Sequence, residues 1–247
     1  MVKVAVIGAK GRMGSTVCAA VQAASDLEVV ARLDAGDAIN EQSLAGASVA
    51  VVFTVPSVKL QNVLDLLAAG VHAVVGTSGW ADDELDQVRA AQKKKSSANV
   101  FIAPNFALSA VLAMEFAAKA APLFESIEIV EMHHPNKVDA PSGTAVATAQ
   151  KISQARKQAG CEPMPDATEA DPQGARGSRY SGVPVHALRL RGMTATEEVL
   201  LGNPGEVLTI RTDSFDRESF MPGVLLAVRK IADTPGVTVG LEHLLDL

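Results

Sequence analysis

The chain opens with Val-Lys-Val-Ala-Val-Ile-Gly-Ala-Lys-Gly-Arg-Met-Gly over residues 2–14, and the rest of the architecture can be worked out from there. A mostly β-branched run is followed at once by Gly8, Gly11 and Gly14, and then by apolar residues of helical period. A glycine turn between a strand and a helix is typical of dinucleotide-binding folds, because it lets a diphosphate approach free N–H groups at the helix N-terminus. Ala9 replaces the usual second glycine, so the turn alone is a weak signal.

The same alternation of short apolar runs and helical segments continues as far as Phe106. It predicts β-α-β units on a parallel sheet. We therefore expect an α/β fold whose first part is a Rossmann-like, doubly wound sheet. The predicted strands are Val2–Ile7, Leu27–Leu33, Val49–Thr54, Val71–Val75 and Val100–Ala103.

After Phe106 the pattern changes. Helical and strand-like segments are followed by a loop rich in Pro, Gly and charge, Gly160–Gly182, and then by strands that short turns connect. This order predicts a second, α+β part with a mixed sheet. The predicted elements are helix Ser109–Ala121, strand Ile127–His133, helix Thr144–Gln158, strands Val185–Leu190, Glu197–Leu201 and Val207–Arg211, and helix Phe220–Ile231.

Composition excludes several classes of protein. The 247 residues are 48% hydrophobic, 20% charged and 4% aromatic, with a net charge of −6. This balance argues against a disordered chain and against a nucleic-acid binder. No apolar run reaches the ~18 residues that span a membrane. Cys18 and Cys161 have no metal or redox spacing, and Met1–Ile7 lacks signal-peptide character, so we expect a cytoplasmic protein.

Asp34 strengthens the interpretation of the glycine turn. It ends the second predicted strand, 20 residues after Gly14, where an acidic side chain accepts hydrogen bonds from an adenine ribose. Lys10 and Arg12 lie where a 2′-phosphate would sit, whereas Asp34 would repel that phosphate. Our hypothesis is that NADH and NADPH both bind. The alternative is a merely structural strand–helix turn.

Three further turns follow predicted strands at the same edge of the sheet, where ligands bind in open α/β folds. They read Phe53-Thr54-Val55-Pro56, Gly76-Thr77-Ser78-Gly79 and Ala103-Pro104-Asn105-Phe106. Each is small, polar or glycine-bearing, as backbone contact with a ligand requires, and the Asn105 amide is suited to a nicotinamide. Any one of them could also be an ordinary connection between a strand and a helix, but three at one edge favour a ligand site.

The most unusual segment is Glu-Met-His-His-Pro-Asn-Lys-Val-Asp-Ala-Pro-Ser-Gly-Thr-Ala, residues 131–145. Ser142 is suited as the N-cap of a helix, and we expect the N–H groups of Gly143, Thr144 and Ala145 to point outward, toward a carboxylate or phosphate. Lys137 can supply a cation to the same anion. The alternative is a capped helix beside surface histidines.

The two adjacent histidines of this segment, His133 and His134, differ in what they can do. On a strand they point to opposite faces, so they are poorly placed to share a metal ion, and we expect none. A histidine titrates near neutral pH and can exchange a proton with a reaction intermediate.

In its motifs the chain resembles the dihydrodipicolinate reductase family, also called 4-hydroxy-tetrahydrodipicolinate reductases. The likeness is carried by Gly8–Gly14, Gly76-Thr77, Ala103–Phe106 and, above all, residues 131–145. It implies reduction of a small cyclic imine dicarboxylate by NADH or NADPH in the diaminopimelate route to lysine. It also implies a homotetramer, a nucleotide-binding domain of residues 1–106 and 216–247, and a substrate-binding and oligomerisation domain of residues 107–215.

The resemblance further assigns roles to individual residues. His133 and Lys137 match the family's proton donors, and His134, Gly143 and Thr144 match its substrate contacts. Ser78 stands where the family usually has Thr, a change that keeps the hydroxyl. The positions that match cofactor contacts are Gly8, Ala9, Lys10, Gly11, Arg12, Met13, Asp34, Gly76, Thr77, Ser78, Ala103, Pro104, Asn105 and Phe106.

Two other functions remain open on the residues alone. A non-enzymatic nicotinamide sensor would keep Gly8–Gly14 but would not need residues 131–145. Another two-domain reductase, such as an aspartate or semialdehyde dehydrogenase, would share the fold. The semialdehyde enzyme needs a nucleophilic cysteine, and neither Cys18 nor Cys161 is placed for that role.

Overall fold

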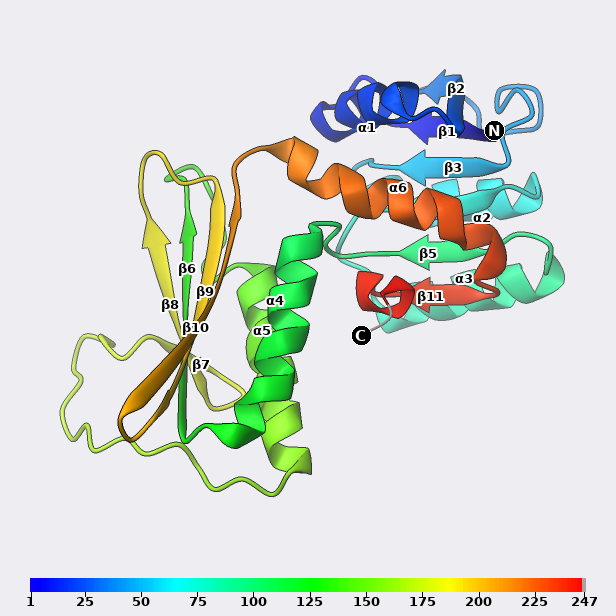
Figure 1. The fold of residues 1–247 in the computed structure, drawn as a ribbon. Coiled ribbons are helices and arrows are strands. Elements are labelled where there is room, and N and C mark those ends of the chain that lie inside the picture. The colour runs from blue at the N-terminus through cyan, green and yellow to red at the C-terminus, as the bar shows by residue number, and fades with distance from the viewer. Residues whose placement is uncertain (246–247) are drawn as a thin grey trace. The chain divides into compact units, whose positions relative to one another are not determined.

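A computed structural model describes residues 1–245, and this part of the chain forms two compact units. The first unit combines Met1–Leu108 with the described residues from Arg217 onward, and the second is Ser109–Asp216. Figure 1 shows that the first unit takes its strands and helices from both the blue and the red end of the chain. The polypeptide therefore leaves the first unit, builds the second and returns.

The first unit is built on a six-stranded sheet in the order β11-β5-β4-β3-β1-β2, and every strand pairs in parallel with its neighbours. This confirms the predicted Rossmann-like sheet. The strands are β1 (Val2–Ile7), β2 (Leu27–Leu33), β3 (Val49–Val52), β4 (His72–Val75), β5 (Val100–Ile102) and β11 (Val237–Val239).

Helices cover both faces of this sheet (Figure 1). Helices α1 (Arg12–Ala23) and α6 (Met221–Lys230) contact each other, and α6 packs on β3 and β4. Helices α2 (Lys59–Ala68) and α3 (Asp82–Lys94) pack together with the core on the other face. Because both faces are covered, the central strands are apolar at almost every position instead of alternating, as in Val49–Val52.

The second unit contains a mixed sheet in the order β10-β9-β6-β8-β7. Strands β6 and β8 are parallel, and the other pairs are antiparallel, which confirms the expected mixed sheet. The helices α4 (Leu108–Ala120) and α5 (Gly143–Gln158) cover one face of it (Figure 1). The strands are β6 (Ser126–His133), β7 (Ser178–Tyr180), β8 (Val183–Arg189), β9 (Ala195–Asn203) and β10 (Glu206–Ser214).

Some elements differ from those predicted. β11 was not expected, and β7 lies inside the segment Gly160–Gly182 that the sequence predicts as a loop. Both strands have only three residues. Five short 3₁₀ helices complete the described chain: η1 (Pro56–Val58), η2 (Ala121–Leu123), η3 (Arg217–Phe220), η4 (Ile231–Asp233) and η5 (Leu241–Leu244). Among residues 1–245, no helix has the length and apolar character needed to cross a membrane.

Candidate active site

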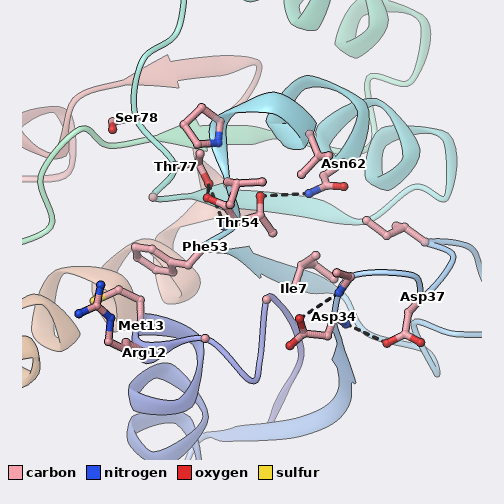
Figure 2. Close-up of a pocket in the computed structure, with 18 of the residues that line it drawn as sticks. Ile7, Arg12, Met13, Asp34, Asp37, Phe53, Thr54, Asn62, Thr77 and Ser78 are labelled. Atoms are coloured by element: carbon pink, nitrogen blue, oxygen red, sulfur yellow. Dashed lines mark hydrogen bonds between the residues drawn. The ribbon is translucent and has the colours of Figure 1, made fainter.

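A pocket of about 700 Å³ lies in the first unit, beside the residues that follow β1, β2, β3 and β4. Figure 2 shows side chains from all of these turns around it. This edge is the one at which ligands bind in open parallel sheets. Eight of the predicted cofactor residues line the pocket: Gly8, Gly11, Arg12, Met13, Asp34, Gly76, Thr77 and Ser78.

The glycines of the first turn are required by close approaches of the backbone. Gly8 has φ +85°, and a Cβ there would lie 2.3 Å from the carbonyl oxygen of Phe53. A Cβ on Gly14 would lie 2.0 Å from the carbonyl oxygen of Gly8. Gly11 is the N-cap of α1 and offers no side-chain acceptor to the first turn. The turn is therefore a tight cradle that leaves backbone N–H groups for an anion.

Asp34 presents an ionised carboxylate at the end of β2. Its two oxygens accept hydrogen bonds from the backbone of Ala35 (2.9 Å) and of Lys10 (2.6 Å). These two bonds hold the pKa of Asp34 below its ordinary value. The side chain of Asp34 lines the pocket, as Figure 2 shows, so the carboxylate is available to a ribose hydroxyl there.

A small network joins the turns after β3 and β4 (Figure 2). The hydroxyl of Thr77 accepts from the backbone N–H of Thr54 at 3.0 Å and lies 3.2 Å from the carbonyl oxygen of Thr54, to which it donates. The amide of Asn62 donates to the Thr54 hydroxyl at 3.1 Å, and the indole of Trp80 donates to the Thr77 carbonyl at 2.8 Å. Hydrogen bonds with Thr54 and Trp80 therefore fix the position of Thr77.

The remaining predicted cofactor residues do not line this pocket. Asn105 accepts a hydrogen bond from the backbone of Ala107 at 2.9 Å, and the ring of Phe106 packs against Phe53 with 5.9 Å between centroids. The four residues of the turn after β5 lie one strand further along the sheet. The residues outside the pocket lining are Ala9, Lys10, Ala103, Pro104, Asn105 and Phe106.

Arg217 is a lining residue that the sequence did not reveal. It comes from η3, at the point where the chain re-enters the first unit, and it lines the same pocket as Arg12. In the part of the chain that the structure describes, neither guanidinium has an ion-pair partner. No local pattern around Arg217 marks it as a ligand, because only the return of the chain brings it to the pocket.

In the second unit, the segment at residues 131–145 is organised around one buried carboxylate. The side chain of Glu131 is fully buried at the end of β6. It accepts from both terminal nitrogens of Arg189 at 2.9 Å, from Nδ1 of His133 at 2.5 Å and from the backbone N–H of Ser142 at 3.1 Å. One carboxylate therefore fixes a cation, the candidate proton donor and the start of α5.

The pKa values in this cluster follow from those contacts. Burial works to raise the pKa of Glu131, but the hydrogen bonds from Arg189 and His133 outweigh it and leave the pKa below its ordinary value. Burial lowers the pKa of His133, and the Glu131 carboxylate opposes that effect. At neutral pH Glu131 is therefore ionised, and His133 can exchange its proton.

The start of α5 has the geometry expected for an anion site. The hydroxyl of Ser142 accepts from the backbone N–H of Ala145 at 3.1 Å, which confirms the predicted N-cap. The same hydrogen bond takes up the Ala145 N–H, so the prediction that this group faces an anion is wrong. A Cβ at Gly143 would meet nothing within 4 Å, so the space outside this turn is open. The ammonium of Lys137 lies 2.7 Å from the Asp139 carboxylate. A substrate carboxylate would compete with Asp139 for that cation.

A second buried carboxylate, Glu197, lies beside the first. Glu197 on β9 is the register partner of Glu131 on β6. One oxygen accepts from the hydroxyl of Thr148 at 2.7 Å, and the other has no hydrogen-bond partner among the described residues. Burial, with the Glu131 charge beside it, raises the pKa of Glu197 to about 7. Sequence reasoning missed both Glu131 and Glu197 as members of the site.

Across residues 1–245, no group of three or more His, Cys, Asp or Glu side chains is arranged to hold a metal ion. The candidate groups instead lie in two places, the pocket beside the glycine turn in the first unit and the cluster around Glu131 in the second.

Comparison with known proteins gives the same division. Residues 2–106 match the family model described as dihydrodipicolinate reductase, N-terminus, and residues 109–245 match the one described as dihydrodipicolinate reductase, C-terminus. The two models together cover nearly the whole chain.

Individual relatives match over their full length. A 4-hydroxy-tetrahydrodipicolinate reductase from Beutenbergia cavernae is 62% identical, with 100% of this chain and 99% of that protein covered. One from Streptomyces coelicolor is 56% identical over 99% of this chain and 98% of its own. The dipicolinate-bound dihydrodipicolinate reductase from Paenisporosarcina sp. TG-14 is 35% identical, with a TM-score of 0.88 over 99% of this chain and 100% of that one.

Proposed function

Because the chain belongs to the dihydrodipicolinate reductase family, we propose that its two clusters divide the reaction of that family between them. The protein is an NAD(P)H-dependent oxidoreductase that reduces 4-hydroxy-tetrahydrodipicolinate to tetrahydrodipicolinate in the diaminopimelate route to lysine. The observation that carries the division of roles is the His133–Glu131 pair at the end of β6, since Glu131 also accepts from the backbone N–H of Ser142 and so joins the candidate proton donor to the start of α5.

The first unit binds the reduced nicotinamide nucleotide. The fit is supported by the cradle at Gly8 and Gly14, which any Cβ would fill, and by the uncapped start of α1. Arg12 and Arg217 neutralise the diphosphate, and Asp34 accepts from the adenine ribose. When bound, the nucleotide supplies a hydride. We also retain the turn at Ala103–Phe106 as a contact for its nicotinamide end.

The second unit binds and protonates the substrate. One substrate carboxylate binds at the backbone N–H groups of Gly143 and Thr144 at the start of α5, and Lys137 leaves Asp139 to pair with that carboxylate. His134 supplies a further polar contact. The substrate loses its hydroxyl group as water, and the reduced ring then takes up a proton from His133. Dipicolinate, which is bound to the relative from Paenisporosarcina, has the same pair of carboxylates.

We propose that both NADH and NADPH are used. Asp34 favours NADH, because its charge repels a 2′-phosphate, whereas Lys10 and Arg12 lie in the adjoining turn and offset that repulsion. Steady-state kinetics of the wild-type enzyme with each nucleotide decide the point. Complete rejection of NADPH would show that the two basic side chains do not compensate.

We propose that the protein works as a homotetramer in the cytoplasm. The face of the second sheet that α4 and α5 leave uncovered carries exposed apolar side chains, among them Val207 (69% exposed) and Leu188 (41% exposed). A symmetric assembly would bury such a face.

The proposed function is tested by nucleotide oxidation with substrate generated freshly from its precursors. We expect oxidation of NADH that depends on the substrate and is inhibited by dipicolinate. Oxidation that is the same with and without substrate would contradict the assignment and would favour a nucleotide sensor.

A further inference from the structure

The strongest unassigned feature of the second unit is the set of four hydrogen bonds that converge on Glu131. One oxygen accepts from Arg189 and from the backbone N–H of Ser142, and the other accepts from Arg189 and from Nδ1 of His133. All of these donors lie on different segments: β6 itself, β8 and the start of α5. The carboxylate is fully buried, so solvent does not compete for any of them.

We propose that Glu131 is the positioning residue of this enzyme, which holds His133 with Nδ1 protonated and Nε2 left for the substrate, while it also fixes the anion-binding start of α5. Arg189 acts on His133 through Glu131. Its guanidinium neutralises the buried carboxylate, while His133 keeps its own hydrogen bond to that carboxylate. The inference rests on the proposed function for the role of His133 as a proton donor. It adds that Glu131 determines which of the two imidazole nitrogens exchanges the proton.

The choice of nitrogen follows from hydrogen-bond chemistry. An ionised carboxylate only accepts hydrogen bonds, so the Nδ1 atom 2.5 Å away must carry a proton. In neutral His133 the proton is then on Nδ1, and Nε2 is the basic atom. In charged His133, Nε2–H is the bond that can donate to the substrate. His133 therefore exchanges its proton through one defined atom.

The charged groups around His133 set the sign of each expected change. Glu131 on the same strand favours the charged imidazole, whereas Lys137 and Arg189 disfavour it. Arg189 is the register partner of His133 on β8, and Asp139 accepts a hydrogen bond from Lys137. Glu197 lies beside Glu131 on β9, and because its pKa is raised to about 7 it changes charge within the neutral range.

The first test is Glu131→Gln. The side chain keeps its shape but loses its charge, and Arg189 is left without a counter-ion, so the pKa of His133 should fall by about 1–3 units. The basic limb of the kcat–pH profile should move to lower pH by the same amount. Nitrogen NMR of the free protein should show that the Nδ1-protonated form is no longer the sole neutral form. In Glu131→Asp, which keeps the charge, the pKa of His133 should fall less than in Glu131→Gln.

Arg189→Gln separates positioning from a general loss of structure. Removing this cation should raise the pKa of His133, in the direction opposite to Glu131→Gln, because the carboxylate then acts on the imidazole alone. Because burial holds the pKa of His133 below its ordinary value, a loosened fold would raise it in both variants, so a fall in Glu131→Gln with a rise in Arg189→Gln marks positioning. If Glu131→Gln does not fold, the tautomer of Arg189→Gln keeps the test decisive: positioning by Glu131 predicts that the Nδ1-protonated form stays the sole neutral form, whereas a loosened fold does not.

The chain offers a matched control on the same strand. Glu128 likewise bridges a histidine, His186 (2.7 Å), and an arginine, Arg176 (2.5 Å), but it lies on the other face of the sheet. Glu128→Gln should leave the kcat–pH profile and the His133 tautomer unchanged.

The outcomes distinguish this inference from the proposed function. If the wild-type enzyme turns over substrate but Glu131→Gln keeps the wild-type tautomer and pH profile, the positioning role is wrong. If no turnover is found at all, the proposed function fails, whereas the NMR titration of the free protein still decides what Glu131 does to His133.

Discussion

His133 and Lys137 carry the two ionisable side chains on which the proposed reaction depends. His133→Ala and Lys137→Ala should each lower kcat by roughly 10²–10⁴-fold, the usual range for a group that transfers or stabilises a proton. The dissociation constant of NADH, measured by fluorescence, serves as the control. It should remain near the wild-type value, because neither residue belongs to the nucleotide-binding unit. Full turnover by either variant would remove that residue from the mechanism.

We expect Asp34 to influence which nucleotide is preferred. Asp34→Ala removes an acceptor for the ribose and a charge that repels a 2′-phosphate, so KM should rise for NADH and fall for NADPH, each by roughly tenfold, about 1.4 kcal/mol. Glu28→Ala is the matched control, since Glu28 is an exposed carboxylate at the opposite end of β2 from Asp34 and does not line the pocket. An equal change for both nucleotides would mean that Asp34 only shapes the turn.

Glu197 should make the stability of the protein depend on pH. Its pKa is raised from 4.5 in the unfolded chain to about 7 in the folded protein. As pH rises from about 4.5 to about 7, the unfolded chain loses this proton first, so wild-type stability falls, by on the order of 3 kcal/mol in full. The glutamine in Glu197→Gln cannot titrate, so the stability of this variant should not fall in this way between pH 4.5 and 7.

Urea unfolding at pH 5 and pH 8 measures the difference. Relative to wild type, Glu197→Gln should gain stability at the higher pH, whereas Glu198→Gln, its more exposed neighbour on the opposite face of β9, should not. If the free energy of unfolding changes with pH by the same amount in wild type and in Glu197→Gln, the pKa of Glu197 is not raised in the folded protein.

Individual residues were predictable from the sequence where a local pattern marks them. The glycine turn, Asp34 and the Ser142 cap each depend on neighbours within a few residues of a strand end, and the structure places all of them at pockets or helix starts. Glu197 and Arg217 could not be found in this way, because only contacts between different strands, or the return of the chain, bring them to their sites. Glu131 lies two residues before His133 on the same strand, but only the structure shows that Arg189 and Ser142 also converge on it.

At the level of the element, the start of α5 combines a structural and a binding role. Ser142→Ala removes the side-chain cap but keeps the backbone N–H that Glu131 holds. Stability should fall by about 0.5–2 kcal/mol, seen as a lower Tm. The KM for the substrate should rise while the KM for NADH stays constant. Ser142→Asp should recover the cap but not the substrate KM, since its charge repels the substrate carboxylate.

Elements were predictable in proportion to their length and burial. β1 and β2 have the predicted bounds, because continuous apolar runs between turn residues leave few alternatives. β7 and β11 have three residues each and are defined mainly by pairing with β8 and β5. β10 extends to Glu206–Ser214, beyond the predicted Val207–Arg211, because its hairpin with β9 continues through polar residues.

At the level of the whole molecule, the net charge of −6 constrains how anions are bound. The proposed substrate and nucleotide are both anionic, so overall attraction cannot supply their binding energy. The binding charge must be local: Arg12 and Arg217 at one helix start, and Lys137 with Gly143 at the other. This explains why both anion sites use helix N-termini, whose dipoles add positive potential without adding net charge.

Assembly depends on the uncovered face of the second sheet. Val207 on β10 is 69% exposed, and it alternates with Leu208, whose register partner Leu201 belongs to the core. Val207 therefore points to the face opposite the helices. In a tetramer formed through this face, a charge there would be buried without a partner. Val207→Asp should reduce the mass measured by light scattering from that of a tetramer to that of a smaller species. Leu123→Asp, equally exposed but on η2, should leave the mass unchanged. A Val207→Asp protein that remains tetrameric would place the interface elsewhere.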